Sequence, residues 1–349
     1  MKVKKVGIVS LSRGVLGEDF VRHEVDLGLK RLRDEGLEVV FLPNARKGID
    51  YLEKNPQARA QDLLRAFEED SIDMILCTIG GIDTYRLLPY LFDHGELRGV
   101  LKEKIFLGFS DTTVNHFMLH KLGLKTFYGQ AFLPDVCELS KEMLPYSKKY
   151  FQELVNTGRI KKVEPSDYWY EERKDFSLEA LGQATKAHPN QGFISLQGPR
   201  SFQGKILGGC LETIYSMISE EDFPESYSLC EKYQIFPSLE EWKDKILLLE
   251  TSENKSKPKY YRKMIKKLKE RGVMDVVAGL LVGKPQDECY WQEYQKILLE
   301  ELKSQELPIA WNINIGHGTP RCILPFGELA KVDLDQQVIS FSAEEEDIP

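Results

Sequence analysis

Ser110, Glu250 and His317 stand just after three apolar runs that read as buried strands, in the segments I-F-L-G-F-S, I-L-L-L-E and A-W-N-I-N-I-G-H. A serine, a histidine and a carboxylate are the set that acyl transfer needs. The imidazole takes the hydroxyl proton and later gives it to the leaving amine, while the carboxylate fixes the tautomer of the imidazole. The order Ser, Glu, His is that of α/β-hydrolases. Chain spacing alone does not show that the three side chains meet.

Each of these residues also has a purely structural interpretation. Ser110 or Asp111 could cap the helix-like segment that follows, because serine and aspartate are favoured N-caps. Glu250 is either a cap or a partly buried acid that awaits a cation, and His317 is either an exposed imidazole or a turn residue. A serine between a strand and a helix is also how several hydrolases present a nucleophile beside free helix amides. From this stretch alone both interpretations stay open.

Length and composition limit the classes of protein. The 349 residues suit two domains, each with its own core. A content of 42% hydrophobic and 29% charged residues is that of a globular protein, and a net charge of −8 does not favour nucleic acid as a partner. The apolar run at 6–11 is too short for a signal peptide, and no run approaches the roughly 20 residues of a membrane helix. We therefore expect no membrane partner.

The cysteines and histidines do not form a metal motif. The six cysteines contain no C-x-x-C pair, and the six histidines contain no H-E-x-x-H. His116 and His120 are four residues apart on a probable helix, but no carboxylate or cysteine completes a zinc set. Scattered cysteines in apolar segments indicate a reduced, cytoplasmic protein. We predict no metal site.

Strands and helices are expected to alternate in the first part of the chain. Apolar spacing and stop signals predict strands at 5–10, 37–42, 72–78 and 105–107, with helices at 18–35, 58–69 and 87–92. This alternation is typical of a doubly wound parallel sheet, whose sites lie at the carboxyl ends of the strands. At the end of the third strand, Gly80-Gly81 either directs amides at a ligand or forms a plain tight turn. Gly14 and Gly17 do not complete G-x-G-x-x-G, so a dinucleotide site is not expected.

The pattern changes at about residue 134. A polar helix is predicted at 144–157, and the charged segment 161–176 holds Tyr168-Trp169-Tyr170, either as a ligand-facing loop or as a staple onto the body. Short strands are predicted at 192–196, 204–207, 245–250, 276–282, 310–315 and within 322–341, around a basic helix at 259–270 with solvated lysines. This half indicates a compact, strand-rich or barrel-like domain.

Six stretches, taken together, resemble the LD-carboxypeptidase family of serine peptidases, including its microcin C immunity branch. They are V-G-I-V-S near the start, G-G-I-D-T-Y-R-L-L-P-Y-L (80–91), G-F-S-D-T-T (108–113), G-G-C-L-E-T (208–213), L-L-L-E-T-S-E (247–253) and G-H-G-T-P-R-C-I-L-P-F-G (316–327). They occur in the order of the family and span nearly the whole chain. The resemblance implies a Rossmann-like N-terminal domain, a β-rich C-terminal domain and a site at their junction.

The same resemblance implies roles for individual residues. Ser110 would be the nucleophile, Glu250 the carboxylate and His317 the base, and the backbone amides of Gly81 and Asp111 would bind the oxyanion. It further implies no metal or organic cofactor and a homodimer. The candidate substrate-binding residues are Arg86, Trp169, Cys210 and Glu212.

Two kinds of substrate fit the resemblance. Murein enzymes of the family release terminal D-alanine from tetrapeptides, whereas immunity-type members cleave an aminoacyl group from a nucleotide-like sulfamate or phosphoramidate. The L-E-T-S-E segment and the long loop with Trp169 favour the immunity branch, because an aromatic ring there could stack on a nucleobase. Cys210 stands where many relatives have asparagine, and a thiol cannot replace the hydrogen bonds of an amide.

We therefore predict an α/β protein with three parts. Residues 1–135 form a Rossmann-like domain with the nucleophile, residues 136–190 a connecting segment with the aromatic loop, and residues 191–349 a β-rich domain with the glutamate and the histidine of the triad. The leading hypothesis is a cytoplasmic serine peptidase that cleaves a small aminoacyl-nucleotide amide. The alternatives are a murein-tetrapeptide LD-carboxypeptidase and a non-catalytic small-molecule binding protein.

Overall fold

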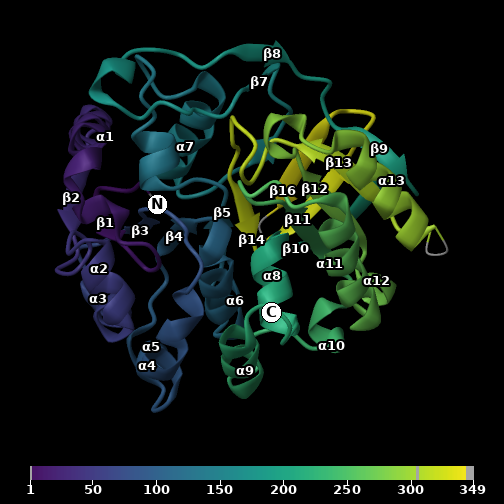
Figure 1. Ribbon diagram of the computed structural model, residues 1–349, viewed down its shortest axis with the longest axis horizontal. Coiled ribbons are helices and arrows are strands. Elements are labelled where there is room, and N and C mark those ends of the chain that lie inside the picture. Colours follow the sequence, from purple (N-terminus) through teal and green to yellow (C-terminus); the bar gives the residue numbers. More distant parts are fainter. Residues whose placement is uncertain (1, 304–305, 343–349) are drawn as a thin grey trace, which may run out of the picture.

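The computed structural model describes residues 2–303 and 306–342, and two main sheets organise it (Figure 1). In the first sheet the strand order is β14-β5-β4-β3-β1-β2, with β1 to β5 parallel and β14 antiparallel to β5. Its strands are β1 (Lys5–Val9), β2 (Glu38–Phe41), β3 (Met74–Cys77), β4 (Ile105–Gly108), β5 (Thr126–Tyr128) and β14 (Leu324–Phe326). The parallel sheet predicted from the sequence is confirmed.

Helices cover this sheet because β1, β3 and β4 are almost wholly apolar and buried, as strands of parallel sheets are. The helices are α1 (Arg22–Asp34), α2 (Ile49–Lys54), α3 (Pro56–Glu68), α4 (Leu88–Phe92), α5 (Glu96–Val100), α6 (Thr113–Lys121) and α7 (Pro145–Thr157). Proline in the first turn of α3 and of α7 suits a position where the backbone N–H has no helical acceptor. α7 ends at Gly158, whose φ of 72° is left-handed.

The second sheet has eight strands in the order β6-β16-β15-β10-β11-β12-β13-β9 and curls into a half-barrel. Its middle strands β10 to β13 are parallel, and the flanking pairs are antiparallel. The strands are β6 (Lys162–Val163), β9 (Ile194–Gln197), β10 (Ser201–Cys210), β11 (Ile246–Glu250), β12 (Gly279–Gly283), β13 (Ile309–Ile313), β15 (Leu329–Asp333) and β16 (Val338–Ser342). The predicted barrel-like C-terminal part is thus confirmed.

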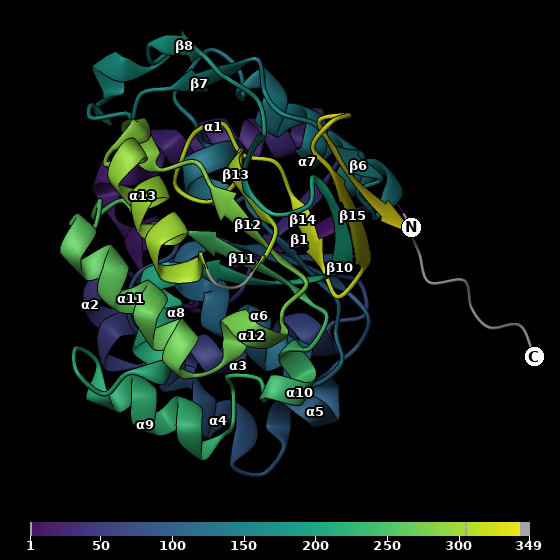
Figure 2. The ribbon, with the colours of Figure 1, turned by 90° about the vertical axis from the view of Figure 1, so that its right-hand side faces the viewer.

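This half holds more helix than the sequence led us to expect. The strand predicted at 276–282 begins only at Gly279, because 273–276 form a short helix after Gly272. The helices are α8 (Leu211–Ile218), α9 (Pro224–Lys232), α10 (Leu239–Trp242), α11 (Pro258–Glu270), α12 (Val273–Val276) and α13 (Trp291–Leu302). Figure 2 shows α11 and α13 side by side in front of β11 and β12. They connect parallel strands, which need a crossover.

Three segments tie the two sheets together. β14 comes from the C-terminal part of the chain but extends the first sheet, and it lies between the two halves in Figure 1. β6 follows α7 and pairs with β16 of the second sheet. The hairpin of β7 (Tyr168–Tyr170) and β8 (Ala187–Pro189) lies at the top of Figure 1. The boundaries 1–135, 136–190 and 191–349 stay a prediction. Among the described residues, no helix combines the length and the apolar character needed to cross a membrane.

Candidate active site

The ends of β4 and β11 and the loop after β13 bring Ser110, Glu250 and His317 together. Ser110 Oγ lies 3.1 Å from His317 Nε2, and His317 Nδ1 lies 2.7 Å from a Glu250 oxygen. All three side chains are buried. This is the geometry in which an imidazole can take a proton from a hydroxyl while a carboxylate orients the ring.

Ser110 stands in a strained turn between β4 and a 3-10 turn, η4 (Ser110–Thr112). Its φ of 66° is left-handed, which a non-glycine residue rarely adopts, and such turns are where α/β-hydrolases expose a nucleophile. Gly80 lies directly against it, because a Cβ added at Gly80 would be 2.7 Å from Ser110 Oγ. The Ser110 side chain makes no capping hydrogen bond to η4 and points to His317 instead.

The two amides expected to bind an oxyanion belong to Gly81 and Asp111. A Cβ added at Gly80 would also lie 3.2 Å from the Asp111 nitrogen, so the Gly80-Gly81 segment and this amide adjoin Ser110 on the same side. Neither amide donates a hydrogen bond to another of the described residues. Both are therefore free to donate to a negative oxygen that develops beside Ser110.

Both carboxylate oxygens of Glu250 accept hydrogen bonds. One accepts from the His317 backbone amide at 3.2 Å and from its Nδ1, and the other accepts from the Tyr128 hydroxyl at 2.7 Å. The same tyrosine oxygen accepts from the Ser110 backbone amide at 3.1 Å. Gly316 makes room, because a Cβ there would collide with Glu250. Tyr128 is a site residue that sequence reasoning missed, although it too ends a strand of the first sheet.

A second carboxylate reaches His317. Glu253 Oε2 lies 2.9 Å from Nε2, the nitrogen that also faces Ser110. Burial alone would lower the pKa of His317, but the charges and hydrogen bonds of Glu250 and Glu253 outweigh it and raise that pKa to about 10. The pKa of Glu253 is lowered to about 2, first by its hydrogen bond to His317. This arrangement of two carboxylates favours the protonated form of the imidazole. Sequence reasoning quoted Glu253 within L-E-T-S-E but gave it no role.

The Asp111 side chain joins the loops after three strands. Its Oδ2 accepts from Ser12 Oγ at 2.5 Å and from the Thr84 amide at 2.9 Å. Burial raises the pKa of Asp111 to about 6, although these two hydrogen bonds act in the opposite direction. Thr84 Oγ1 in turn donates to the Leu11 carbonyl. The carboxyl group thus fixes the loops that carry Ser110 and the candidate oxyanion amide of Gly81.

A cavity of about 480 Å³ opens beside the triad. Its lining residues are Ser12, Arg13, Gly14, Ile49, Glu53, Gly81, Ile82, Asp83, Tyr85, Arg86, Glu225 and Glu253. Arg86, a predicted substrate-binding residue, is in this wall, and its guanidinium donates to the Glu53 carbonyl at 2.9 Å. Because Gly81 and Glu253 belong to the wall, a molecule in the cavity would reach the candidate catalytic groups.

Cys210 and Glu212 lie on the other side of the triad. The Cys210 sulfur is within 4.8 Å of a Glu250 oxygen and a His317 nitrogen, and burial raises the pKa of the thiol well above its ordinary value. A neutral thiol beside an ion pair that is already hydrogen-bonded is a poor metal ligand. Glu212 uses both oxygens to hold the loop after β11, accepting from the Ser252 amide at 3.0 Å and the Ser256 hydroxyl at 2.6 Å. It supports the loop of Glu253 and does not point to an open site.

Trp169 is buried in the β7–β8 hairpin. The His188 ring stacks on it at 4.3 Å between centroids, and Lys284 Nζ lies over the ring at 5.1 Å. The hairpin adjoins the histidine loop, since the Tyr170 amide donates to the Thr319 carbonyl at 2.9 Å. A nucleobase could stack on Trp169 only after one of the two neighbours moves. The predicted contact therefore stays a prediction that requires a rearrangement.

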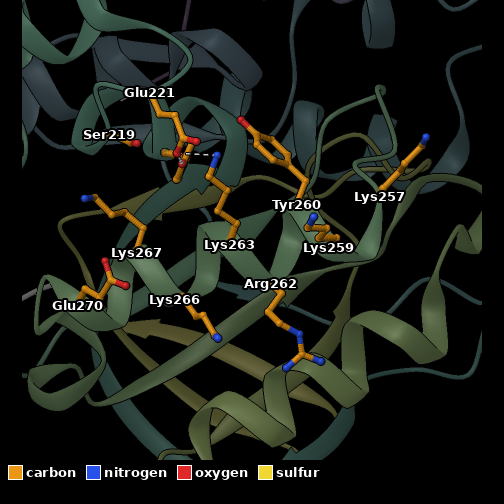
Figure 3. Close-up of a pocket in the computed structure, with 11 residues that line it drawn as sticks. Ser219, Glu221, Lys257, Lys259, Tyr260, Arg262, Lys263, Lys266, Lys267 and Glu270 are labelled. Atoms are coloured by element: carbon orange, nitrogen blue, oxygen red, sulfur yellow. Dashed lines mark hydrogen bonds and ion pairs between the residues drawn. The ribbon is translucent and has the colours of Figure 1, made fainter.

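A larger cavity of about 650 Å³ lies along α11, and five lysines and Arg262 are among the residues that line it (Figure 3). Lys263 pairs there with Glu221 at 2.6 Å, and Arg262 binds Glu300 and Glu301 at the edge. None of the triad residues lines this cavity. The basic helix is a solvated, ion-paired face, as the sequence predicted.

Comparison with protein families identifies the class. The chain matches the LD-carboxypeptidase N-terminal domain over residues 6–129 and the LD-carboxypeptidase C-terminal domain over residues 203–332. These matches cover more than half of the chain, so the protein belongs to the LD-carboxypeptidase family of serine peptidases. It is a hydrolase of the serine carboxypeptidase class.

Individual relatives and solved structures resemble the chain over most of its length. The chain is 58% identical to an MccF-like protein from Streptococcus pneumoniae solved in complex with AMP, with a TM-score of 0.96 over 97% of this chain and 99% of that one. It is 24% identical to the microcin C7 self-immunity protein MccF of Escherichia coli, over 90% of this chain and 87% of that protein. It is 26% identical to the putative carboxypeptidase YocD of Bacillus subtilis, over 95% of each. The fold is that of MccF-like proteins.

Proposed function

We propose that the protein is a serine peptidase of the immunity-type branch, which hydrolyses the amide between an aminoacyl group and a nucleotide-like moiety. The observation that carries the proposal is the hydrogen-bonded series from Ser110 Oγ through His317 to Glu250, at 3.1 and 2.7 Å. Its position beside a cavity of about 480 Å³ suits a small substrate rather than a folded protein.

The mechanism follows from these positions. His317 removes the Ser110 proton through Nε2 as Oγ attacks the acyl carbon, and Glu250 stabilises the cation on the ring. The amides of Gly81 and Asp111 donate to the oxyanion, so they act mainly where charge develops. The tetrahedral intermediate collapses when His317 gives its proton to the leaving nitrogen. Water then hydrolyses the acyl-enzyme by the same proton transfers, and Ser110 is restored.

The nucleotide part of the proposal rests on relatives. The Streptococcus pneumoniae protein, 58% identical to this chain, was solved with AMP. Structures of MccF itself hold aspartyl sulfamoyl adenosine and glutamyl sulfamoyl guanosine. The alternative is release of terminal D-alanine from murein tetrapeptides, and a probable murein peptide carboxypeptidase of Bacillus subtilis is 23% identical over 326 residues. A cytoplasmic location and a homodimer complete the proposal.

The test compares two substrates by mass spectrometry. The purified protein is incubated at neutral pH with an aspartyl sulfamoyl adenylate or with a murein tetrapeptide that ends in D-alanine. Cleavage of the adenylate alone supports the immunity-type activity, and release of D-alanine alone replaces it with the murein activity. A Ser110→Ala variant should fold normally and turn over neither substrate. The proposal would be overturned if the Ser110→Ala variant turned over either substrate. It would also be overturned if the wild type turned over neither.

A further inference from the structure

Two carboxylates share the imidazole of His317, and only one of them suits a general base. Glu250 binds Nδ1, the nitrogen that an orienting carboxylate uses. Glu253 binds Nε2 at 2.9 Å, while Ser110 Oγ lies 3.1 Å from the same nitrogen. A proton on Nε2 that is held by Glu253 leaves no lone pair to accept the serine proton. The arrangement is therefore a resting one, and Glu253 must leave before Ser110 can be activated.

The groups around the ring agree with this view. They are Ser110 from η4, Cys210 from β10, Glu250 from β11 with Tyr128 of β5 behind it, Glu253 from the loop after β11, and Arg321, which donates to the His317 carbonyl. Arg13 acts on Glu253 and lowers the pKa of its carboxyl group. Glu250 and Glu253 are the carboxylates that contact the ring itself. Their combined charge outweighs the effect of burial and raises the pKa of His317.

The two carboxylates differ in freedom to move. The Glu250 side chain is 0% exposed and tied at both oxygens, whereas the Glu253 side chain is 58% exposed. Glu212 holds the chain on either side of Glu253, because it accepts from the Ser252 backbone amide and from the Ser256 hydroxyl. The loop is thus fixed at its base while its carboxylate is free to change rotamer.

The cavity next to Glu253 is suited to a cation. Four carboxylates line it, against two arginines. Arg86 lies 3.4 Å from Asp83, which also binds the buried Arg59 at 2.7 Å, so this part of the wall carries one positive charge in excess. Glu53, Glu225 and Glu253 against Arg13 add two negative charges in excess, so the wall as a whole is negative by one charge. A positively charged group of a substrate would be attracted there, within reach of Glu253.

We propose that Glu253 is a gating and specificity residue that blocks His317 in the free enzyme and releases it when an ammonium group of the substrate enters this cavity. The proposal rests on the proposed amide hydrolysis and adds the substrate class, an amide with an ammonium group near the scissile bond. When Glu253 turns to the ammonium, the proton on Nε2 is lost to water. Nε2 can then accept the Ser110 proton.

The first experiment needs no substrate. A fluorophosphonate probe labels an activated serine, and its labelling rate is measured against pH for the wild type, Glu253→Gln and, as a control for the loss of one exposed charge, Glu240→Gln. In Glu253→Gln the acid limb of the rate should move to lower pH by one unit or more, which is about a tenfold faster reaction at a fixed pH on that limb. In Glu240→Gln the acid limb of the labelling rate should stay at the same pH as in the wild type. An unchanged limb or slower labelling in Glu253→Gln would overturn the gate.

The second experiment tests the ammonium group. Aspartyl sulfamoyl adenosine is compared with its N-acetylated form, which lacks the positive charge. The wild type should prefer the free amine in kcat/KM, and Glu253→Gln should lose this preference mainly through KM. A preference that persists in Glu253→Gln would contradict the specificity role. If the probe labels Ser110 of the wild type but neither amide is hydrolysed, the proposed substrate is wrong, and the pH profile of labelling still tests the gating role of Glu253. If the probe never labels the wild type, both the proposed function and the gating role are wrong.

Discussion

Replacing Tyr128 with phenylalanine tests whether its hydroxyl fixes the positions of Ser110 and Glu250 relative to each other. The Tyr128 hydroxyl donates to Glu250 at 2.7 Å and accepts from the Ser110 amide at 3.1 Å, and the side chain is fully buried. Phenylalanine keeps the ring, which stacks on Phe326 at 5.2 Å, and removes only the oxygen. The change therefore removes these two hydrogen bonds and a longer contact of 3.4 Å with Thr113 Oγ1.

The magnitude follows from what each partner loses. A hydrogen bond to a charged group contributes about 1.5–3 kcal/mol, and a buried amide left without an acceptor costs about 1–3 kcal/mol. Since both losses occur in one place, we expect Tyr128→Phe to lower the free energy of unfolding by about 2.5–6 kcal/mol. Ser110 and Glu250 would also shift relative to His317, and small misplacements of catalytic groups lower kcat by about a hundredfold.

The assay pairs denaturant unfolding with kcat/KM, and Tyr261→Phe is the matched control. Tyr261 is equally buried, its ring stacks on Tyr294 at 4.0 Å, and its hydroxyl has no hydrogen-bond partner among the described residues. Removing this hydroxyl should leave stability unchanged or slightly higher and activity unchanged. If Tyr128→Phe behaves like the control, the hydroxyl does not couple Ser110 to Glu250 and the reasoning is wrong.

Three further changes probe the same site. Gly80→Ala should lower kcat/KM by about a hundredfold because its Cβ would lie 2.7 Å from Ser110 Oγ, and turnover near the wild-type rate would contradict this contact. Asp111→Asn tests a buried acid whose pKa is raised from 3.8 to about 6. Between these values the folded chain keeps a proton that the unfolded chain has lost, so the group's contribution to stability falls as pH rises. Urea unfolding at pH 4 and 7 should show the wild type losing up to about 3 kcal/mol relative to Asp111→Asn, and a constant difference would refute the shift. Glu212→Ala should free the loop at Ser256 and speed its limited proteolysis, while unchanged cleavage would mean that other contacts hold the loop.

The sequence could predict the first sheet, and that Ser110 and Glu250 stand at strand ends, for a physical reason. Buried parallel strands are short apolar runs, and a functional side chain that follows such a run lies at the edge where ligands bind. Ser110 and Glu250 both carry this signal. In the C-terminal half the basic helix at 259–270 was predicted and is α11, but other helices such as α8 were not, because a short apolar run does not by itself distinguish a helix from a strand.

Contacts across the two sheets could not be predicted in the same way. Tyr128 is one tyrosine among fifteen, and only the packing of β5 against the end of β11 gives its hydroxyl a role. Glu253 lies three residues after Glu250, but the turn of the loop decides that its carboxylate returns to the same imidazole. Tyr168-Trp169-Tyr170 could be either a ligand-facing loop or a staple onto the body, and the sequence could not show that His188 from the next strand stacks on Trp169.

The candidate site lies at the junction of the two sheets. Ser110 and Tyr128 belong to the first sheet, and Glu250 belongs to the second, yet their hydrogen bonds connect directly. The Cys210 amide of the second sheet also donates to Thr113 beside the nucleophile, at 3.1 Å. β14 crosses back to pair with β5 only a few residues after His317. Because the chain passes from one sheet to the other at the point where Ser110, Glu250 and His317 meet, a change that loosens this junction should lower the proposed activity before it unfolds either sheet.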